Sequence, residues 1–168
     1  LLRGALGWWL AAPGLVGGAC WYDLLGRRHA PQMGAPGLAR NTRPGALGDC
    51  PTYVAASTQY TDLSAVDAAL SGSTEATLAA WFNRGTGSVA QAMARGANTN
   101  GIRFNVYWAA NNVIYATCDT APSTAGYTQI SGQTQTGWHH LTLVYNGVES
   151  VAADRLKTYI DGVRVTTT

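Results

Sequence analysis

The sequence of 168 residues has little charge and very little glutamate. Charged residues make up 12% of the chain, about half of the share of roughly 25% that is usual in soluble domains. Glutamate occurs only as Glu75 and Glu149. A net charge of +2 does not indicate a nucleic-acid partner, because such partners select strongly basic surfaces. We therefore predict no nucleic-acid binding, and few carboxylates are available for acid–base chemistry.

Long apolar runs and several common motifs are also absent from the sequence. No stretch of about 18 apolar residues without charge occurs, so no membrane span is predicted. The chain contains no Gly-x-Ser-x-Gly motif, no P-loop and no dinucleotide fingerprint, which removes the usual signatures of hydrolases, nucleotide phosphatases and Rossmann enzymes. No Cys-x-x-Cys pair gives a zinc signature. We predict no cofactor.

Aromatic and small polar residues are abundant instead. Hydrophobic residues make up 46% of the chain, with six tryptophans and eight tyrosines. The length suits one domain with a sizeable core, and we predict a single domain over residues 1–168. A surface poor in charge and rich in Thr, Asn and Gly is typical of a β-sandwich outside a cell or on a particle. The expected location is extracellular or the surface of a virion.

The three cysteines, Cys20, Cys50 and Cys118, do not decide the redox compartment. An odd number cannot all pair within one chain. One disulfide with one thiol left over and three buried thiols both remain open. Three buried thiols are the first choice, because unpaired cysteine often serves as a small core residue.

The most specific pattern is an antiparallel meander near the end of the sequence. Trp138–Tyr145 is rich in Leu, Val, Thr and aromatic residues, which predicts a strand. After a polar loop, Arg155–Ile160 is the second predicted strand. Asp161-Gly162 then supplies a type I′ turn, in which both central residues need φ > 0. Val163–Val165 begins the returning strand.

Further strands are predicted from alternation and from residue type. In Ile102–Trp108, apolar residues occupy every second position, as in a strand with one buried face. Other strands are expected over Gly4–Ala12, Trp21–Leu25, Ala76–Asn83, Val89–Arg95, Val113–Thr117 and Tyr127–Ile130. Two segments are predicted as loops, Asp119–Gly126 and the proline-containing Ala30–Pro51.

Several segments together resemble the laminin-G-like, concanavalin A-like β-sandwich modules. The first is the meander, with Trp-His-His, Tyr-Asn-Gly and Leu-Lys-Thr-Tyr-Ile-Asp-Gly-Val in order. The others are Gly7-Trp8-Trp9-Leu10, Tyr22-Asp23-Leu24-Leu25-Gly26-Arg27 and Thr77-Leu78-x-x-Trp81-Phe82. The resemblance implies an all-β fold, an antiparallel β-sandwich of the jelly-roll type.

The resemblance also bears on catalysis and metals. Retaining glucanases of this fold carry Glu-x-Asp-x-x-Glu on one strand, and this sequence lacks that motif, so we predict no enzyme. His139 and His140 are interpreted as structural, because neighbouring strand residues point to opposite faces. Many such modules hold one calcium ion through aspartates at the rim. Asp49, Asp119 and Asp161 lie in predicted loops without forming an acidic cluster, so no metal site is predicted.

The candidate ligand-binding residues are Tyr107, Trp108, Asn111 and Asn112, at the tip of the predicted hairpin 102–117. Carbohydrate binding needs exposed aromatic rings that stack on sugars, and amides that bind hydroxyl groups. The alternation also places Trp108 with the apolar residues of its strand, so a core position for Trp108 is an equal alternative.

The end of the sequence suggests a protein partner. In the resembled family, a segment similar to Gly-x-Ile-Asp-Asp-Val-Arg-Ile-Tyr follows the last hairpin and pairs beside the first strand. The sequence stops at Thr168 without such a closing strand, and an uncovered apolar edge strand invites aggregation. We therefore expect another protein subunit or domain to cover the Gly4–Ala12 strand.

These observations predict a non-catalytic binding or surface module of a larger extracellular or virion assembly, with glycan as the candidate ligand. The alternative is a purely structural shell or decoration protein that binds no sugar. A glycoside hydrolase of the same fold ranks third.

Overall fold

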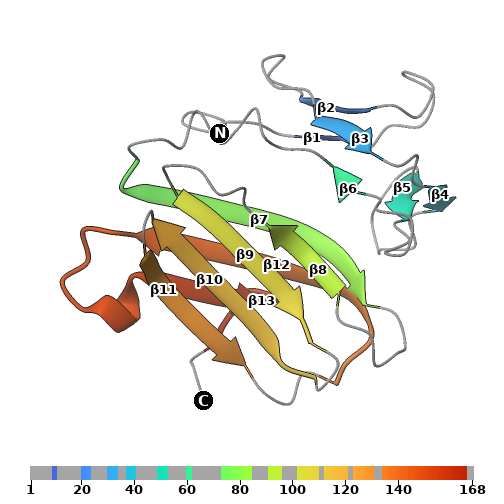
Figure 1. Cartoon of the computed structure of the whole chain (residues 1–168). Coiled ribbons are helices and arrows are strands. Elements are labelled where there is room, and N and C mark those ends of the chain that lie inside the picture. Colours follow the sequence, from blue (N-terminus) through green and yellow to red (C-terminus); the bar gives the residue numbers. More distant parts are fainter. Residues whose placement is uncertain are drawn as a thin grey trace. The chain divides into compact units, whose positions relative to one another are not determined.

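A computed structural model of the chain shows strands throughout the part that it describes (Figure 1). It divides the chain into two compact units, Leu1–Ala69 and Leu70–Thr168. The described residues are 9–10, 20–23, 30–33, 37–40, 49–52, 60–61, 73–84, 91–95, 102–109, 112–120, 123–130 and 134–165. Side chains are described for residues 73–83, 104–107, 109, 112–118, 129 and 134–165.

The described residues of the first unit form six short strands. They are β1 (Trp9–Leu10), β2 (Cys20–Asp23), β3 (Ala30–Met33), β4 (Gly37–Arg40), β5 (Asp49–Thr52) and β6 (Tyr60–Thr61). One sheet has the order β1-β2-β3-β6, and β4 pairs with β5 in a separate hairpin. The predicted loop Ala30–Pro51 is therefore wrong where β3, β4 and β5 lie. Of the predicted first strand, only Trp9–Leu10 falls within the described residues, as β1.

The proline in β3 is compatible with pairing because the two halves of this strand have different neighbours. Ala30 and Pro31 pair with β2, whereas Gln32 and Met33 pair with β6. Proline has no N–H to donate, so it fits where a strand needs bonds on one side only. β1 itself pairs with β2 inside the chain. The predicted cover of this first strand by another protein stays a prediction.

In the second unit, the part of the chain that the structure describes forms eight strands in two four-stranded antiparallel sheets. One sheet has the order β11-β10-β9-β8, and the other has the order β14-β13-β12-β7. Their bounds are β7 (Glu75–Arg84), β8 (Gln91–Arg95), β9 (Ile102–Trp108), β10 (Ile114–Thr120), β11 (Ser123–Ile130), β12 (Gly137–Asn146), β13 (Leu156–Ile160) and β14 (Val163–Val165). A short 3₁₀ helix, η2 (Ala152–Asp154), lies between β12 and β13.

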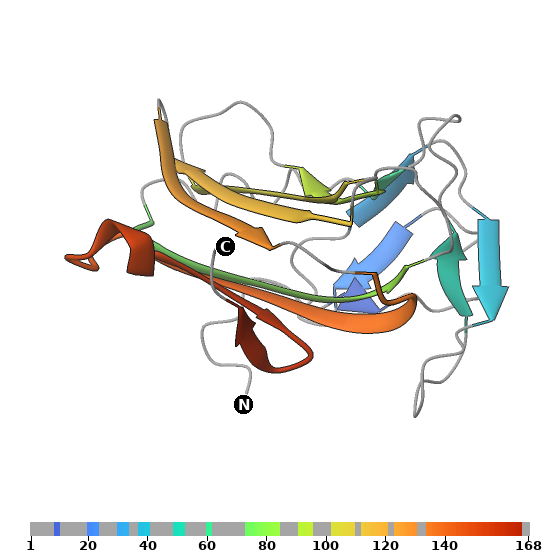
Figure 2. The same ribbon diagram turned by 90° about the horizontal axis from the view of Figure 1, so that it is seen from below.

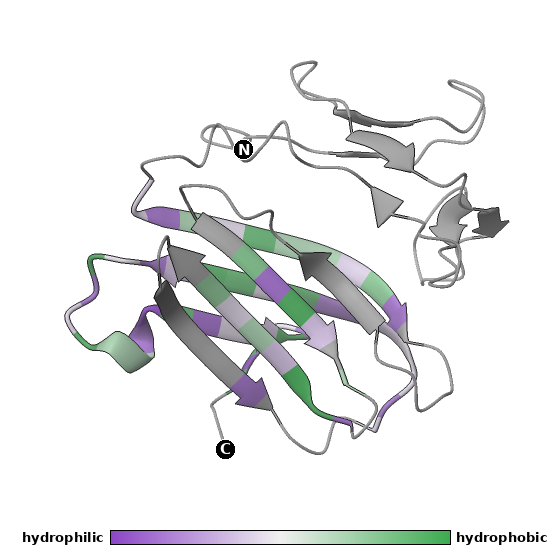
Figure 3. Cartoon of the chain, viewed as in Figure 1, coloured by the Kyte–Doolittle hydropathy of each residue, from purple (hydrophilic) through white to green (hydrophobic). Residues whose placement is uncertain are grey.

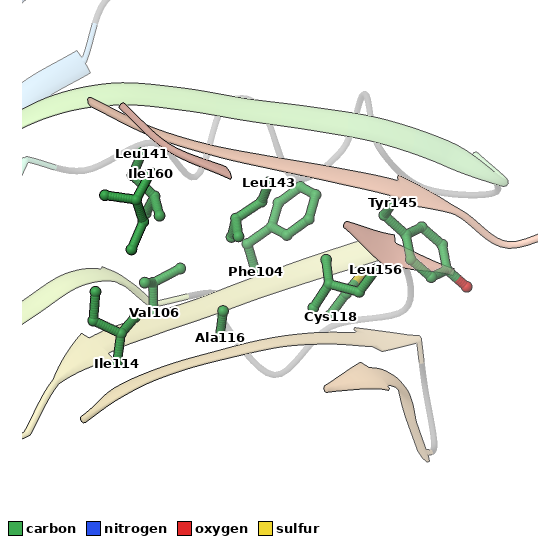
Figure 4. Close-up of a cluster of buried hydrophobic side chains, with 10 residues drawn as sticks. All are labelled: Phe104, Val106, Ile114, Ala116, Cys118, Leu141, Leu143, Tyr145, Leu156 and Ile160. Atoms are coloured by element: carbon green, nitrogen blue, oxygen red, sulfur yellow. The ribbon is translucent and has the colours of Figure 1, made fainter. Parts of the chain in front are cut away.

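The core of the second unit lies between these two sheets (Figure 2). In β9, Phe104 and Val106 are buried, whereas Asn105 between them is half-buried and more hydrophilic (Figure 3). The side chains of the two sheets point toward one another (Figure 4). The buried cluster consists of Phe104, Val106, Ile114, Ala116, Cys118, Leu141, Leu143, Tyr145, Leu156 and Ile160. The predicted all-β sandwich is confirmed.

The C-terminal meander follows its prediction closely. β12 pairs with β13, and β13 pairs with β14, both antiparallel. Asp161 has φ 51° and Gly162 has φ 81°, which are the two positive values that the type I′ turn requires. Cys118 is fully buried in the core, whereas only the backbone is described for Cys20 and Cys50.

The predicted loop Asp119–Gly126 is wrong at both of its ends. β10 continues to Thr120, and β11 already begins at Ser123. Asp119 pairs with Arg103 of β9 and with Thr124 of β11, after a register shift that follows Cys118. Aspartate is otherwise uncommon in strands. Asp119 lies in one because it pairs with a neighbouring strand on each side.

Candidate functional site

Two stacked tyrosines mark the outward face of the β8–β11 sheet. Tyr107 of β9 and Tyr115 of β10 are direct cross-strand partners. Their ring centroids lie 4.9 Å apart, with 17° between the ring planes. They face outward because their sequence neighbours Val106, Ile114 and Ala116 are buried in the core. Tyr107 remains 42% exposed, so a flat aromatic surface is open to solvent.

Polar groups continue this surface along the same two strands. Asn105 and Thr117 are the next cross-strand pair on the outward side. The Asn105 side-chain amide donates a hydrogen bond of 3.3 Å to the Thr117 hydroxyl. This bond fixes the orientation of the Asn105 amide beside the rings. We call these four residues, Tyr107, Tyr115, Asn105 and Thr117, the tyrosine platform.

The structure describes the four predicted site residues to different extents. Tyr107 is exposed and belongs to the tyrosine platform. Trp108 ends β9 with its backbone opposite Ile114, and its side chain lies outside the described part. Asn111 also lies outside the described residues. Asn112 has φ 61°, and its N–H donates to the carbonyl of Ala109 at 3.1 Å. Asn112 therefore shapes the turn of the hairpin.

A second aromatic pair lies on the outward face of the other sheet. Trp81 of β7 is the direct cross-strand partner of His140 of β12. Their ring centroids are 5.0 Å apart, with the planes tilted by 57°. The Trp81 residue is 48% exposed. The Nδ1 atom of His140 lies 3.3 Å from the Thr142 hydroxyl, which orients the imidazole.

His139 faces the opposite way from His140 and binds Asp161. The Nδ1 of His139, with its ring buried, lies 2.8 Å from Oδ2 of Asp161. An ionised carboxylate only accepts hydrogen bonds, so Nδ1 carries the proton. The backbone N–H of His140 donates to Oδ1 of the same carboxylate at 2.8 Å, and the Asp161 N–H donates to the His140 carbonyl. Asp161 thus ties the β13–β14 turn to β12.

These contacts shift the pKa of Asp161 downward. Partial burial raises the pKa, but the hydrogen bonds from His139 and from the His140 backbone, with the charges of the two imidazoles, outweigh it. The net pKa of Asp161 lies below its ordinary value of 3.8. The predicted structural role of His139 agrees with this arrangement, and the role of Asp161 extends beyond its turn.

Asp161 is a described carboxylate that contacts an aromatic pair, through the backbone N–H of His140; the others bind elsewhere or lie exposed. Asp154 binds Arg164 at 2.8 Å, and Glu149 lies 3.8 Å from Lys157. Glu75 is exposed at the first position of β7. Among the residues with described placement, no three His, Cys, Asp or Glu side chains form a group that could hold a metal ion. The two aromatic pairs offer exposed rings and hydrogen-bonding groups to a ligand.

The comparison with known families agrees with this architecture. A family model of the concanavalin A-like lectin/glucanases superfamily matches residues 55–168, about two thirds of the chain. The chain belongs to this superfamily. No curated protein and no solved structure matches the chain significantly.

The superfamily sets limits on the function without deciding it. It includes both sugar-binding lectins and glycosidases, so membership alone leaves catalysis open. Domains of the laminin-G-like kind are typically extracellular. Within the described residues, no helix is long and apolar enough to span a membrane. The resemblance seen at Gly7–Arg27 lies outside the matched residues.

Sequence reasoning did not select Tyr115, Trp81 or His140 as binding-site candidates. A tight connection between β9 and β10 pairs Tyr107 with Tyr115, and this register could have been counted from the predicted hairpin. The contact between Trp81 and His140 joins strands that are distant in sequence. No pattern within either strand predicts which residues of the two strands pair with each other.

Proposed function

We propose that this chain is a non-catalytic carbohydrate-binding module that acts outside the cell. The observation that carries the proposal is the tyrosine platform, where an exposed ring stacks on a second ring beside a fixed amide. Superfamily membership makes sugar a reasonable ligand class, because lectins belong to the same superfamily. The low charge of the chain, 12%, favours neutral polysaccharides over strongly anionic ones.

The tyrosine platform offers the two kinds of contact that a pyranose ring needs. The C–H face of a sugar is apolar and packs on an aromatic ring, which supplies a large buried area with few rotatable bonds. The hydroxyl groups at the sugar rim need donors and acceptors. Asn105 and Thr117 provide both, since an amide carries a carbonyl and an NH₂, and a hydroxyl donates and accepts.

The non-catalytic part of the proposal rests on the carboxylates. Glycoside hydrolysis normally needs two carboxyl groups that flank the scissile bond, about 5–10 Å apart. No carboxylate belongs to the tyrosine platform, and the described Asp154 and Asp161 already bind Arg164 and His139. Glu75 and Glu149 are the only glutamates in the chain. A bound sugar at Tyr107 would therefore meet neither a general acid nor a nucleophile among the described side chains.

The test is electrophoresis of the 168-residue chain through native gels that contain a soluble polysaccharide. Mixed-linkage β-glucan, galactomannan and dextran serve as probes, with heparin as the anionic comparison. We expect at least one neutral polysaccharide to retard the protein. Tyr107→Ala should weaken the interaction about tenfold, because losing an aromatic contact of about 1.4 kcal/mol changes an equilibrium constant by that factor.

Two control variants separate stacking from other effects. Tyr107→Phe keeps the ring and should retain most of the binding. Val148→Ala removes an exposed apolar side chain, 67% exposed, away from the platform and should change nothing. Retardation that is equal in Tyr107→Ala and in the unaltered protein would contradict the platform. Release of reducing sugar from any probe would contradict the non-catalytic assignment.

A further inference from the structure

We propose that Trp81 and His140 form the centre of a second carbohydrate-binding surface, and that one chain therefore cross-links two polysaccharide molecules. This inference rests on the proposed function, because the tyrosine platform is the other of the two binding surfaces. The second surface lies on the β7–β12–β13–β14 sheet. We call it the tryptophan platform and define it by Ala79, Trp81, Asn83, His140 and Thr142.

The strand pattern directs the tryptophan platform away from the core. On β12, Leu141 and Leu143 are buried, and His140 and Thr142 alternate with them. On β7, Leu78 and Phe82 pack against the core, whereas Trp81 is 48% exposed. Alternate residues of a strand point to opposite faces. Trp81 and His140 therefore share the outward face.

The surroundings of Trp81 leave much of its ring system accessible. Its nearest outward neighbours on β7 are Ala79 and Asn83, both exposed. A methyl group is too short to cover an indole two residues away. β7 is also the outermost strand in the described order of its sheet. The planes of the indole and of the His140 ring are tilted by 57°, so the two rings do not stack face to face.

Hydrogen-bonding side chains accompany Trp81 on this face of the sheet. Thr142 lies 3.3 Å from His140 through its hydroxyl, and the Asn83 amide is exposed beside the ring. Asp161, Asp154 and Glu149 pair with His139, Arg164 and Lys157, and the exposed Glu75 lies on the same face of β7 about 20 Å from Trp81. An aromatic face with neutral amide and hydroxyl groups fits a neutral sugar, as the tyrosine platform does. A strongly charged ligand would lack a partner among these groups.

The positions of the two platforms determine the consequence. They lie on the outward faces of the two sheets of one sandwich, with the core cluster between them. A single sugar chain lying flat on one face does not reach the other face. Two platforms that face away from each other therefore bind separate chains, or distant parts of one long chain. Occupation of both surfaces would join polysaccharide molecules into a network and raise the apparent affinity.

The experiment blocks each platform in turn in the full 168-residue chain. Ala79→Arg places a long side chain beside Trp81 without removing a core contact. Thr77→Arg is the matched control, because it adds the same side chain on the same strand face about 13 Å from Trp81. Trp81→Ala removes the ring itself. Tyr107→Ala disables the tyrosine platform. Thermal unfolding of each variant shows that its fold is intact.

Two measurements are made with mixed-linkage β-glucan, galactomannan and dextran. Gel retardation gives the affinity, and dynamic light scattering of the mixtures reports cross-linking. We expect the unaltered protein and Thr77→Arg to produce large particles with a retarding polysaccharide. Ala79→Arg, Trp81→Ala and Tyr107→Ala should each remain retarded, with affinity reduced about tenfold, and should form no large particles. Tyr107→Ala combined with Ala79→Arg should abolish retardation.

The outcomes separate this inference from the proposed function. If Tyr107→Ala alone abolishes retardation and Ala79→Arg changes nothing, the tyrosine platform stands and the tryptophan platform is overturned. If the unaltered protein is retarded but forms no large particles, the cross-linking proposal is overturned. If no polysaccharide retards the unaltered protein, the proposed function and this inference both fail.

Discussion

At the residue scale, Asp161 joins a turn to a neighbouring strand through one carboxylate. Replacing it by Asn keeps a carbonyl for the His140 N–H and keeps tolerance of the positive φ. It removes the charge that strengthens the bond to His139. We expect Asp161→Asn to lower the free energy of unfolding by about 1 kcal/mol, a modest value because the carboxylate is 46% exposed. Urea unfolding at pH 7 measures this difference.

The pH dependence of that difference follows from the lowered pKa of Asp161. A carboxyl group whose pKa is lower in the folded state stabilises the fold above its unfolded-state pKa. That stabilisation is lost as the pH falls below about 3.8 and through the folded value. The difference in the free energy of unfolding between Asp161→Asn and the unaltered protein should therefore persist from pH 7 to about pH 4, and it should disappear below about pH 4.

The control is Asp154→Asn, which breaks an exposed ion pair with Arg164 of the same 2.8 Å length. Exposed pairs contribute little, about 0–1 kcal/mol, so this variant should unfold almost like the unaltered protein. Equal destabilisation by both substitutions at pH 7 would show that Asp161 contributes no more than a surface charge.

At the element scale, the end of β12 and the β13–β14 turn each need a glycine, but for different reasons. Gly147 is needed for space, and Gly162 is needed for its backbone conformation. A Cβ atom on Gly147 would lie 2.7 Å from the Tyr145 hydroxyl and 3.0 Å from the Thr74 carbonyl oxygen. The Gly147 N–H donates to that same carbonyl at 2.7 Å, so the backbones cannot easily separate. Gly162 instead has open space around it and a φ of +81°.

We expect Gly147→Ala to cost about 1–3 kcal/mol through overcrowding, and Gly162→Ala to cost about 1 kcal/mol through its backbone conformation. The two causes separate in a Tyr145→Phe background, which removes the hydroxyl nearest to the new methyl group. There the cost of Gly147→Ala should shrink, whereas that of Gly162→Ala should not change. An unchanged cost for both would place the strain elsewhere, and urea unfolding of the five variants and the unaltered protein decides.

The elements that sequence reasoning predicted well are those with local determinants. β9 and β14 agree with their predicted bounds, and β12 agrees within one residue at each end. Alternation and the Asp161-Gly162 turn are properties of neighbouring residues. The missed parts of β10 and β11 hold Asp, Ser and Gly in strands because β10 pairs with β9 and β11 pairs with β10. That pairing is tertiary, and it overrides local preference.

The residues of the candidate site also differ in whether local sequence or strand pairing determines them. Tyr107 was predicted because its exposure follows from the alternation of its own strand. Trp81 and His140 were singled out for their family pattern, but their contact depends on the register between β7 and β12. A shift of that register by one residue would turn one of the two rings toward the core. Buried partners such as Leu78 and Leu143, which also pair across this register, set it through packing.

At the scale of the whole molecule, the chain divides into units at Ala69 and Leu70. The superfamily match begins at residue 55, inside the first unit, so the match crosses this division. The sequence predicts a single domain over residues 1–168. A single domain would lose its protection against hydrogen exchange as one unit, whereas two domains would lose it separately.

Leu143→Ala tests the single-domain prediction. Leu143 is fully buried between the two sheets of the second unit, and its truncation should cost about 2–5 kcal/mol through lost contacts and a cavity. Native-state hydrogen exchange, followed by mass spectrometry, reads the slowest-exchanging peptides from residues 1–69 and 70–168 separately. If the chain is one cooperative domain, both sets should lose the same free energy of protection. Loss confined to residues 70–168 would instead show two domains that unfold independently, and Val148→Ala, exposed in the same unit, should leave both sets unchanged.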